Sequence, residues 1–270
     1  MTSLGVVGME RPAARLRVHA WLARNQKWLL GLLGFVPLLV LWQVGGSLIE
    51  DNTFISTPVQ VALAARAQIA SGQLLQDFLV SLSELVPGFG LAIVIGVPLG
   101  LVIGRSRWVE YALDPYIWFF YSAPIIAFYP LLIMWFGLGS RTVTVLTFLF
   151  AFFPIVSNTV VGVHEVDRTL IRAARSFGAT KFQLLRLVVL PASVPAIAAG
   201  LRLGIGRALI GTVVGEFFGA SAGLGFRISL YGTQMQIGDM FVSVVVVMII
   251  GVVLMHALQW LESRVDTWRS

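Results

Sequence analysis

Uncharged apolar runs occupy most of this chain, and several are long enough to cross a lipid bilayer. A membrane-spanning helix needs about 20 consecutive, mainly apolar residues, and the runs at 28–49, 142–163 and 240–261 meet that length. Charged residues make up 12% of the 270 residues, about half of the roughly 25% that is typical of soluble domains. The sequence therefore predicts an all-α, polytopic membrane protein that uses lipid as the solvent around most of its length.

Six such segments can be separated along the chain. The predicted spans cover about 28–49, 78–104, 116–136, 142–163, 192–218 and 240–261. Together they form one transmembrane domain, 28–261, preceded by a basic segment, 1–27, and followed by a short tail, 262–270. The loop 164–190 connects the fourth and fifth spans. An even number of spans places both termini on the same side of the membrane.

The distribution of Lys and Arg predicts which side that is. These residues gather in 1–27 and in the loop 164–190, whereas the segments on the opposite side hold only Arg66, Arg141 and Arg227. Cytoplasmic loops carry an excess of Lys and Arg, so we expect both termini and the loop to be cytoplasmic. The net charge of +6 is thus attributed to topology rather than to nucleic-acid binding. Residues 11–27 resemble a basic amphipathic helix lying on the membrane surface, with a disordered basic tail as the alternative.

The loop 164–190 carries the start and stop signals of a first short helix. Asp167 can cap the start of a helix over 168–177, and Gly178 is the residue type expected just past its end. Within it, Ala173 and Ala174 would keep one face flat enough for a partner's groove, while Phe177 would protrude. The alternative is that this helix packs on its own protein.

A second helix is expected directly after the turn. Thr180 can cap its start, the helix would cover 181–190, and Pro191 would end or kink it. The segment 172–191, RAARSFGATKFQLLRLVVLP, is thus a charged helix–turn–helix element between two apolar spans. This arrangement favours docking to another protein.

The same residues support a family resemblance. The pattern formed by Ala173-Ala174, Gly178, Val188 and Leu190-Pro191 resembles the coupling motif of the permease subunits of binding-protein-dependent ABC importers. The family motif begins Glu-Ala-Ala, and Arg172 stands here in the position of the Glu. The resemblance covers 54–260, and several short segments are similar to permeases of the sulfonate, taurine and nitrate type: ISTPVQV at 55–61, WFGLG at 135–139 and GLR at 200–202. Two further departures are Glu84, where relatives often carry Arg, and Arg207, where they often have an apolar residue.

The resemblance implies the type I ABC importer permease fold in a bacterial cytoplasmic (inner) membrane. It also implies a function: the permease subunit of an ATP-driven importer that moves a small anionic solute, sulfonate-, taurine- or nitrate-like, into the cytoplasm. The implied partners are a cytosolic ABC ATPase dimer, a second permease copy forming a homodimer, and an extracytoplasmic substrate-binding protein. Contact with the ATPase would fall to Arg172, Ala173, Ala174, Phe177, Gly178 and Pro191.

The residues do not favour an enzyme. The only lysines, Lys27 and Lys181, lie outside any GxxxxGK[ST] pattern, so we expect ATP and its Mg²⁺ to be bound by a separate ATPase chain. The segment 219–223 matches GxSxG, but that motif requires a strand-to-helix turn and a catalytic triad. Three scattered His residues and no Cys predict no metal site, and no cofactor is expected in this chain.

Polar groups inside the spans are the candidates for a solute pathway. They are Arg207, Glu216, Tyr121, Ser122, Tyr129 and Asn158. A charge deep in a span marks an interior or functional position, and we expect Arg207 to line the pathway and favour an anion, with pairing to another helix as the alternative. Each uncharged member of the set could instead form a hydrogen bond between helices.

Two alternatives concern packing and mechanism. Gly96, Gly100 and Gly104 form a small-residue stripe, which predicts close helix packing or, alternatively, a dimer contact or a surface that slides during gating. The competing function is a secondary transporter or channel without an ATPase partner. It would predict an inverted repeat and paired mid-membrane acids for ion coupling, and the sequence indicates neither.

Overall fold

The computed structural model describes residues 34–48 and 55–266. The predicted basic segment 1–27, the start of the first span and the end of the tail lie outside these residues. The chain divides into two compact units, Met1–Gln60 and Val61–Ser270, which are considered separately. Every regular element in the described part is helical, so the prediction of an all-α fold is confirmed.

The first unit holds the helix Gly34–Leu48 and the start of α2 (Pro58–Ala70). The indole Nε1 of Trp42 donates a hydrogen bond of 2.8 Å to the carbonyl of Ser56. The amide of Thr57 donates one of 3.0 Å to the side-chain oxygen of Gln60. The segment leading into α2 is thereby held against the helix.

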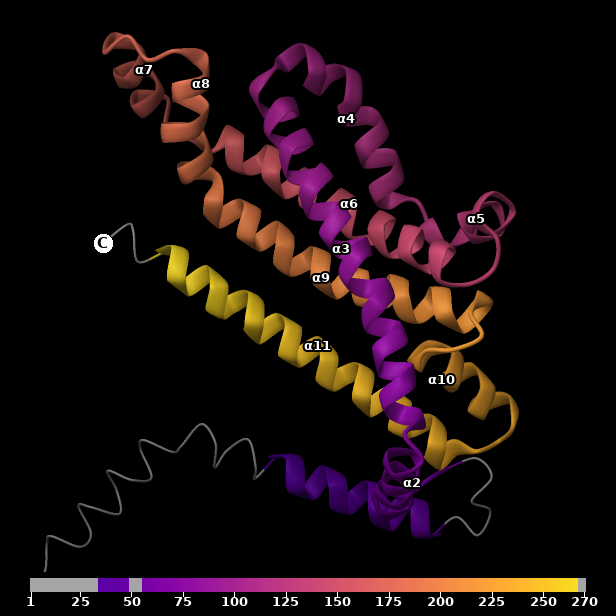
Figure 1. The fold of residues 1–270 in the computed structure, drawn as a ribbon. Helices are drawn as coiled ribbons and strands as arrows, with labels where there is room; N and C mark the ends of the chain where they lie inside the picture. The colour runs from indigo at the N-terminus through magenta and orange to yellow at the C-terminus, as the bar shows by residue number, and fades with distance from the viewer. Residues whose placement is uncertain (1–33, 49–54, 267–270) are drawn as a thin grey trace, which may run out of the picture. The chain divides into compact units, whose positions relative to one another are not determined.

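The second unit contains the remaining helices (Figure 1). In chain order they are α3 (Gln73–Arg105), α4 (Arg107–Ser122), η1 (Ile125–Phe128), α5 (Tyr129–Phe136), α6 (Ser140–His164), α7 (Arg168–Ser176), α8 (Lys181–Leu184), η2 (Leu185–Val189), α9 (Leu190–Gly219), α10 (Leu224–Thr233) and α11 (Ile237–Asp266).

Helix α6 is the centre of this unit, because its two most extensive contacts are with α3 and α9. The core between these helices includes Ala92 from α3, Ala151 and Ile155 from α6, and Ala208 from α9, all fully buried. Mainly small side chains therefore fill the contact, which lets the helix backbones approach closely, as in other membrane helix pairs.

The glycine stripe of α3 lies in the contact with α6. A Cβ at Gly100 would lie 2.6 Å from the Cβ of Thr159, and one at Gly104 would lie 2.7 Å from the Cβ of Val163. Neither position has room for a side chain. The stripe therefore serves helix packing within the chain, and the prediction of close helix packing is confirmed.

Four helices in the described part are long and apolar enough to cross a membrane: α3, α6, Lys181–Gly219 and Ile237–Arg264. The segment of the predicted span 116–136 forms two helices, Arg107–Ser122 and Ile125–Phe136, which meet at 92°. The break falls at Ala123, which is extended (ψ 144°) because the following Pro124 disfavours the α-helical conformation. This pair is a broken span or a re-entrant loop, and the six spans with their bounds stay a prediction.

Candidate coupling loop and pathway residues

The first helix of the loop is formed by the predicted signals. The carboxylate Oδ1 of Asp167 accepts a hydrogen bond of 2.7 Å from the amide of Thr169 and caps α7. This backbone hydrogen bond is the main cause that lowers the pKa of Asp167 below its ordinary value. Gly178 has φ +79°, a conformation in which a side chain is strained. The predicted cap and turn are thus confirmed, with the helix ending at Ser176.

The second helix also starts as predicted but does not end where it was expected. Thr180 and Gln183 form a reciprocal capping box, which satisfies two amides at the start of α8. The helix does not end at Pro191, because one apolar helical segment runs from Lys181 to Gly219. The alternative, a kink at Pro191, stays a prediction.

A π-helical turn explains how the helix passes the proline. Residues Leu185–Val189 form this turn, and the amide of Leu190 bonds to the carbonyl of Leu185, five residues back. Pro191 lies directly after this turn, at the start of the α-helical part of the segment. The widened π turn thus stands just before the proline, where a regular α-helix would be disturbed by its ring.

Helix α7 has one face packed on the bundle and one face free. Ile171 and Ala174 pack against a buried apolar cluster that includes Val163 and Val189. In contrast, the side chain of Phe177 is 91% exposed. Of the predicted ATPase-contacting residues, Arg172, Ala173, Phe177 and Gly178 lie on the exposed surface of the loop, Ala174 is half-buried, and Pro191 is exposed at the start of α9.

Two of the pathway candidates line one cavity. Arg207 of α9 and Tyr121 of α4 border a cavity of about 190 Å³ together with Pro124, Phe153 and Pro154. Arg207 is exposed, and no carboxylate lies within ion-pair distance of it in the part of the chain that the structure describes. The neighbouring Arg202 differs, since it pairs with Glu262 of α11.

Three further candidates make hydrogen bonds to the backbone. The hydroxyl of Tyr129 is buried and donates a bond of 2.8 Å to the carbonyl of Gly215, which links α5 to α9. Asn158 donates a bond of 2.9 Å to the carbonyl of Pro154, one turn earlier in α6. Ser122 is exposed and bonds within α4, to the carbonyl of Trp118.

Glu216 lies in a buried polar cluster at the junction of α3, α9 and α10. Its Oε2 accepts a hydrogen bond of 2.6 Å from the amide of Gly225. Its carboxyl group also faces that of Glu84 on α3, and the two residues are 0% and 1% exposed. The expectation that the chain lacks paired mid-membrane acids for ion coupling stays a prediction. The two acids are far apart in sequence, so only the fold reveals their proximity.

The same cluster contains two residues that sequence reasoning did not single out. Asp77 forms an ion pair of 2.6 Å with Arg227 of α10, and Ser81 accepts a bond of 2.9 Å from the amide of Leu224. Asp77, Ser81 and Glu84 are spaced at i, i+4 and i+7, which places them on one helix face. This spacing is the sequence signal by which the two residues could have been found. It indicates a polar helix face that needs hydrogen-bonding partners when it is buried.

An apolar bundle of long helices with a helix–turn–helix exposed between two of them is the architecture of a polytopic membrane protein. Residues 96–267 match the family described as binding-protein-dependent transport system inner membrane component. The chain belongs to this family of ABC importer permeases, whose members work with an ATPase on another chain and with a substrate-binding protein.

Two curated relatives resemble nearly the whole chain. The putative aliphatic sulfonates transport permease protein SsuC of Bacillus subtilis (strain 168) is 33% identical over 90% of this chain and 88% of its own length. The taurine transport system permease protein TauC of Escherichia coli (strain K12) is 31% identical over 94% of each chain. A chain of the inward-facing MetNI methionine ABC transporter superposes with a TM-score of 0.63 and 21% identity, covering 75% of this chain and 99% of that one, which shows a shared fold.

Proposed function

We propose that this permease works as a homodimer and imports a small sulfonate-type anion, driven by a cytosolic ATPase dimer that binds ATP and Mg²⁺. The exposed face of the α7 loop is the observation that carries the coupling part of this proposal. Both termini and the loop are taken to face the cytoplasm, because Lys and Arg gather in the terminal segment 1–27 and in the loop.

The loop is built to transmit force rather than to bend. Capped at Asp167, turned at Gly178 and packed through Ile171 and Ala174, it presents Phe177 on a stiff support. A protruding aromatic side chain beside small residues fits a groove in a partner. Closure of the ATPase dimer would move this element, and α9 with it, as a rigid body.

The coupling part can be tested by co-purifying the ATPase with the tagged permease. Phe177→Ser should reduce ATPase recovery roughly thirtyfold, because truncating an aromatic anchor in an interface costs about 2 kcal/mol. Leu138→Ser removes a side chain that is 72% exposed at the other end of α6 and is the matched control. Stoichiometric ATPase on a well-folded Phe177→Ser variant would show that the coupling assignment is wrong.

The anionic substrate is supported by the cavity that Arg207 and Tyr121 line and by the sulfonate and taurine named for the two relatives. An Arg without a carboxylate partner in the described residues offers a charge-assisted hydrogen bond to a sulfonate oxygen. Two copies of the permease would bring two such residues to one pathway.

The substrate part is tested by uptake of radiolabelled taurine and a short alkanesulfonate in cells that express the complete transporter. Arg207→Leu should abolish most uptake while ATPase recovery stays normal, and Arg207→Lys should restore part of it by keeping the charge. Uptake at the wild-type rate in Arg207→Leu would contradict a role for Arg207 in anion passage. It would leave the coupling assignment intact.

A further inference from the structure

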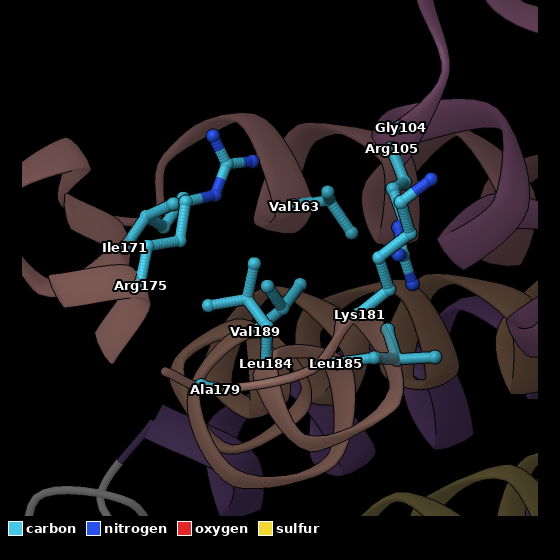
Figure 2. Close-up of a pocket in the computed structure, with 10 residues that line it drawn as sticks. All are labelled: Gly104, Arg105, Val163, Ile171, Arg175, Ala179, Lys181, Leu184, Leu185 and Val189. Carbon is cyan, nitrogen blue, oxygen red and sulfur yellow. The ribbon is translucent and has the colours of Figure 1, made fainter. Parts of the chain in front are cut away.

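A second cavity, larger than the one at Arg207, lies behind the coupling loop. Its volume is about 550 Å³, and its wall combines the end of α3, the end of α6 and the residues of α7, α8 and η2. Figure 2 shows Arg105 and Lys181 together on one side of the opening and Arg175 across from them. Val163, Leu184 and Val189 form its apolar wall. A volume of this size is typical of sites for small ligands.

The charge of the cavity is entirely positive. Arg105, Arg175 and Lys181 line it, and no acidic residue does. In the ranges that the structure covers, none of the three cations has a carboxylate within ion-pair distance. Cations that surround a concave apolar surface concentrate their field in it and attract anions.

The cavity lies where two membrane segments end. Arg105 is the last residue of α3 and Val163 lies at the end of α6, while Lys181 reaches the cavity from the loop that follows α6. The ends of spans lie at the level of the lipid headgroups, where Trp is enriched, and Trp108 beside this end of α3 is 88% exposed. The anion in reach of this cavity is therefore a phospholipid phosphate.

The face of α7 that borders the cavity differs from the face proposed for the ATPase. Arg175 follows Ile171 by one helical turn, so the two side chains share a face, and Ile171 packs on the bundle. Both residues line the cavity, whereas Phe177 points away from the packed face and is 91% exposed. A ligand here could remain bound while the loop engages another protein.

We propose that this cavity binds the phosphate of an anionic phospholipid, with Arg105, Arg175 and Lys181 as its ligands. The Arg guanidinium groups present paired donors to phosphate oxygens, and Lys181 adds a point charge. Basic pockets between membrane helices are suited to such headgroups. By joining α3 to α7, the bound lipid would brace the loop against the bundle.

The test is a native mass spectrometry titration of the delipidated full-length permease with dioleoylphosphatidylglycerol and, separately, dioleoylphosphatidylcholine. The double variant Arg105→Gln/Arg175→Gln should bind the anionic lipid about 25-fold more weakly, since each cation near a membrane surface contributes roughly fivefold. Arg168→Gln/Arg186→Gln makes the same change in charge in the same region without touching the cavity, and its affinity should stay within about twofold of the wild type.

Three outcomes complete the test. The Arg105→Lys/Arg175→Lys variant should recover part of the binding, because it keeps the charge but not the paired donors, and an unchanged melting temperature of the Arg105→Gln/Arg175→Gln variant excludes misfolding as the cause of the loss. Competition by millimolar inorganic phosphate, without preference for the anionic lipid, would assign the site to free phosphate and overturn the lipid assignment. Equal affinity for the anionic lipid in the two Gln double variants would overturn the site itself. Since the titration contains no ATPase, none of these three outcomes depends on the coupling assignment.

Discussion

The amide of Gly225 donates a hydrogen bond of 2.6 Å to the buried carboxyl group of Glu216, so the start of α10 closes over the C-terminal end of α9. The loop between these helices wraps the carboxyl group tightly. A Cβ at Gly223 would lie 2.5 Å from Cδ of Glu216, and Gly223 itself has φ +107°. The segment 219–223, which matches a hydrolase motif in sequence, is therefore a loop shaped around a buried acid.

The first prediction follows from this contact. Gly223→Ala should destabilise the permease by about 2 kcal/mol or more, because the new methyl group meets the Glu216 carboxyl group and the backbone is strained for any L-residue. The melting temperature in detergent measures the effect. Ser221→Ala, two residues away and exposed, is the control and should melt within error of the wild type. A Gly223→Ala variant of unchanged stability would mean that the loop is looser than the contact indicates.

The second prediction concerns the ion pair between Asp77 and Arg227. Its two side chains are 3% and 21% exposed, and Asp77 also accepts a bond of 3.1 Å from the amide of Gly223. Breaking a fully buried pair from one side costs about 3–5 kcal/mol, so Asp77→Asn should cost about 2–3 kcal/mol because Arg227 retains some water. A double-mutant cycle with Arg227→Gln should give a coupling energy above about 1 kcal/mol. Additive losses would mean that the two side chains do not interact.

Local signals explain why the coupling loop could be predicted from the sequence. The caps at Asp167 and Thr180 and the turn at Gly178 depend only on residues within a few positions along the chain. The sequence gives the identity of all these residues directly. The long apolar runs predicted α3, α6 and α11 for the same reason. In a bilayer, every backbone group of such a run must be satisfied within the segment, which leaves the helix as the only solution.

What could not be predicted depends on distant residues. The sequence contains no sign that Glu84 and Glu216 would meet, because their contact is created by the packing of α3 and α9 on α6. The size of the bend after Ala123 could not be predicted, because Pro124 indicates only that a kink is allowed there, and composition treats 116–136 as one run. Continuation of the helix past Pro191 could not be predicted, because a π turn has no distinct composition and only the backbone shows it.

The third prediction is a dependence on pH at the start of α7. The pKa of Asp167 is lowered below its ordinary value of 3.8 by the amide hydrogen bond from Thr169. A lowered pKa in the folded state means that the cap contributes stability above pH 3.8, which is lost as the pH falls through the lower folded value. Hydrogen exchange of loop peptides, corrected for intrinsic rates, should therefore show α7 loosening below that pH and no change near neutrality. Asp167→Asn keeps an acceptor that does not titrate, so its exchange should be independent of pH, and a wild-type response identical to it would contradict the prediction.

The last prediction concerns the π turn at Leu185–Val189, which joins the coupling loop to α9. Deleting Arg186, an exposed residue within it, should convert the turn to regular α-helix and keep the loop near its present orientation, because a π turn accommodates one extra residue locally. Deleting both Arg186 and Leu187 removes one residue more than the turn accommodates, so the loop would rotate by about 100° and shift by about 1.5 Å relative to α9. Recovery of the ATPase and solute uptake should both fall in the double deletion, and the single deletion, which should retain them, is the control. A well-folded double deletion with normal coupling would show that the orientation of the loop relative to α9 does not matter.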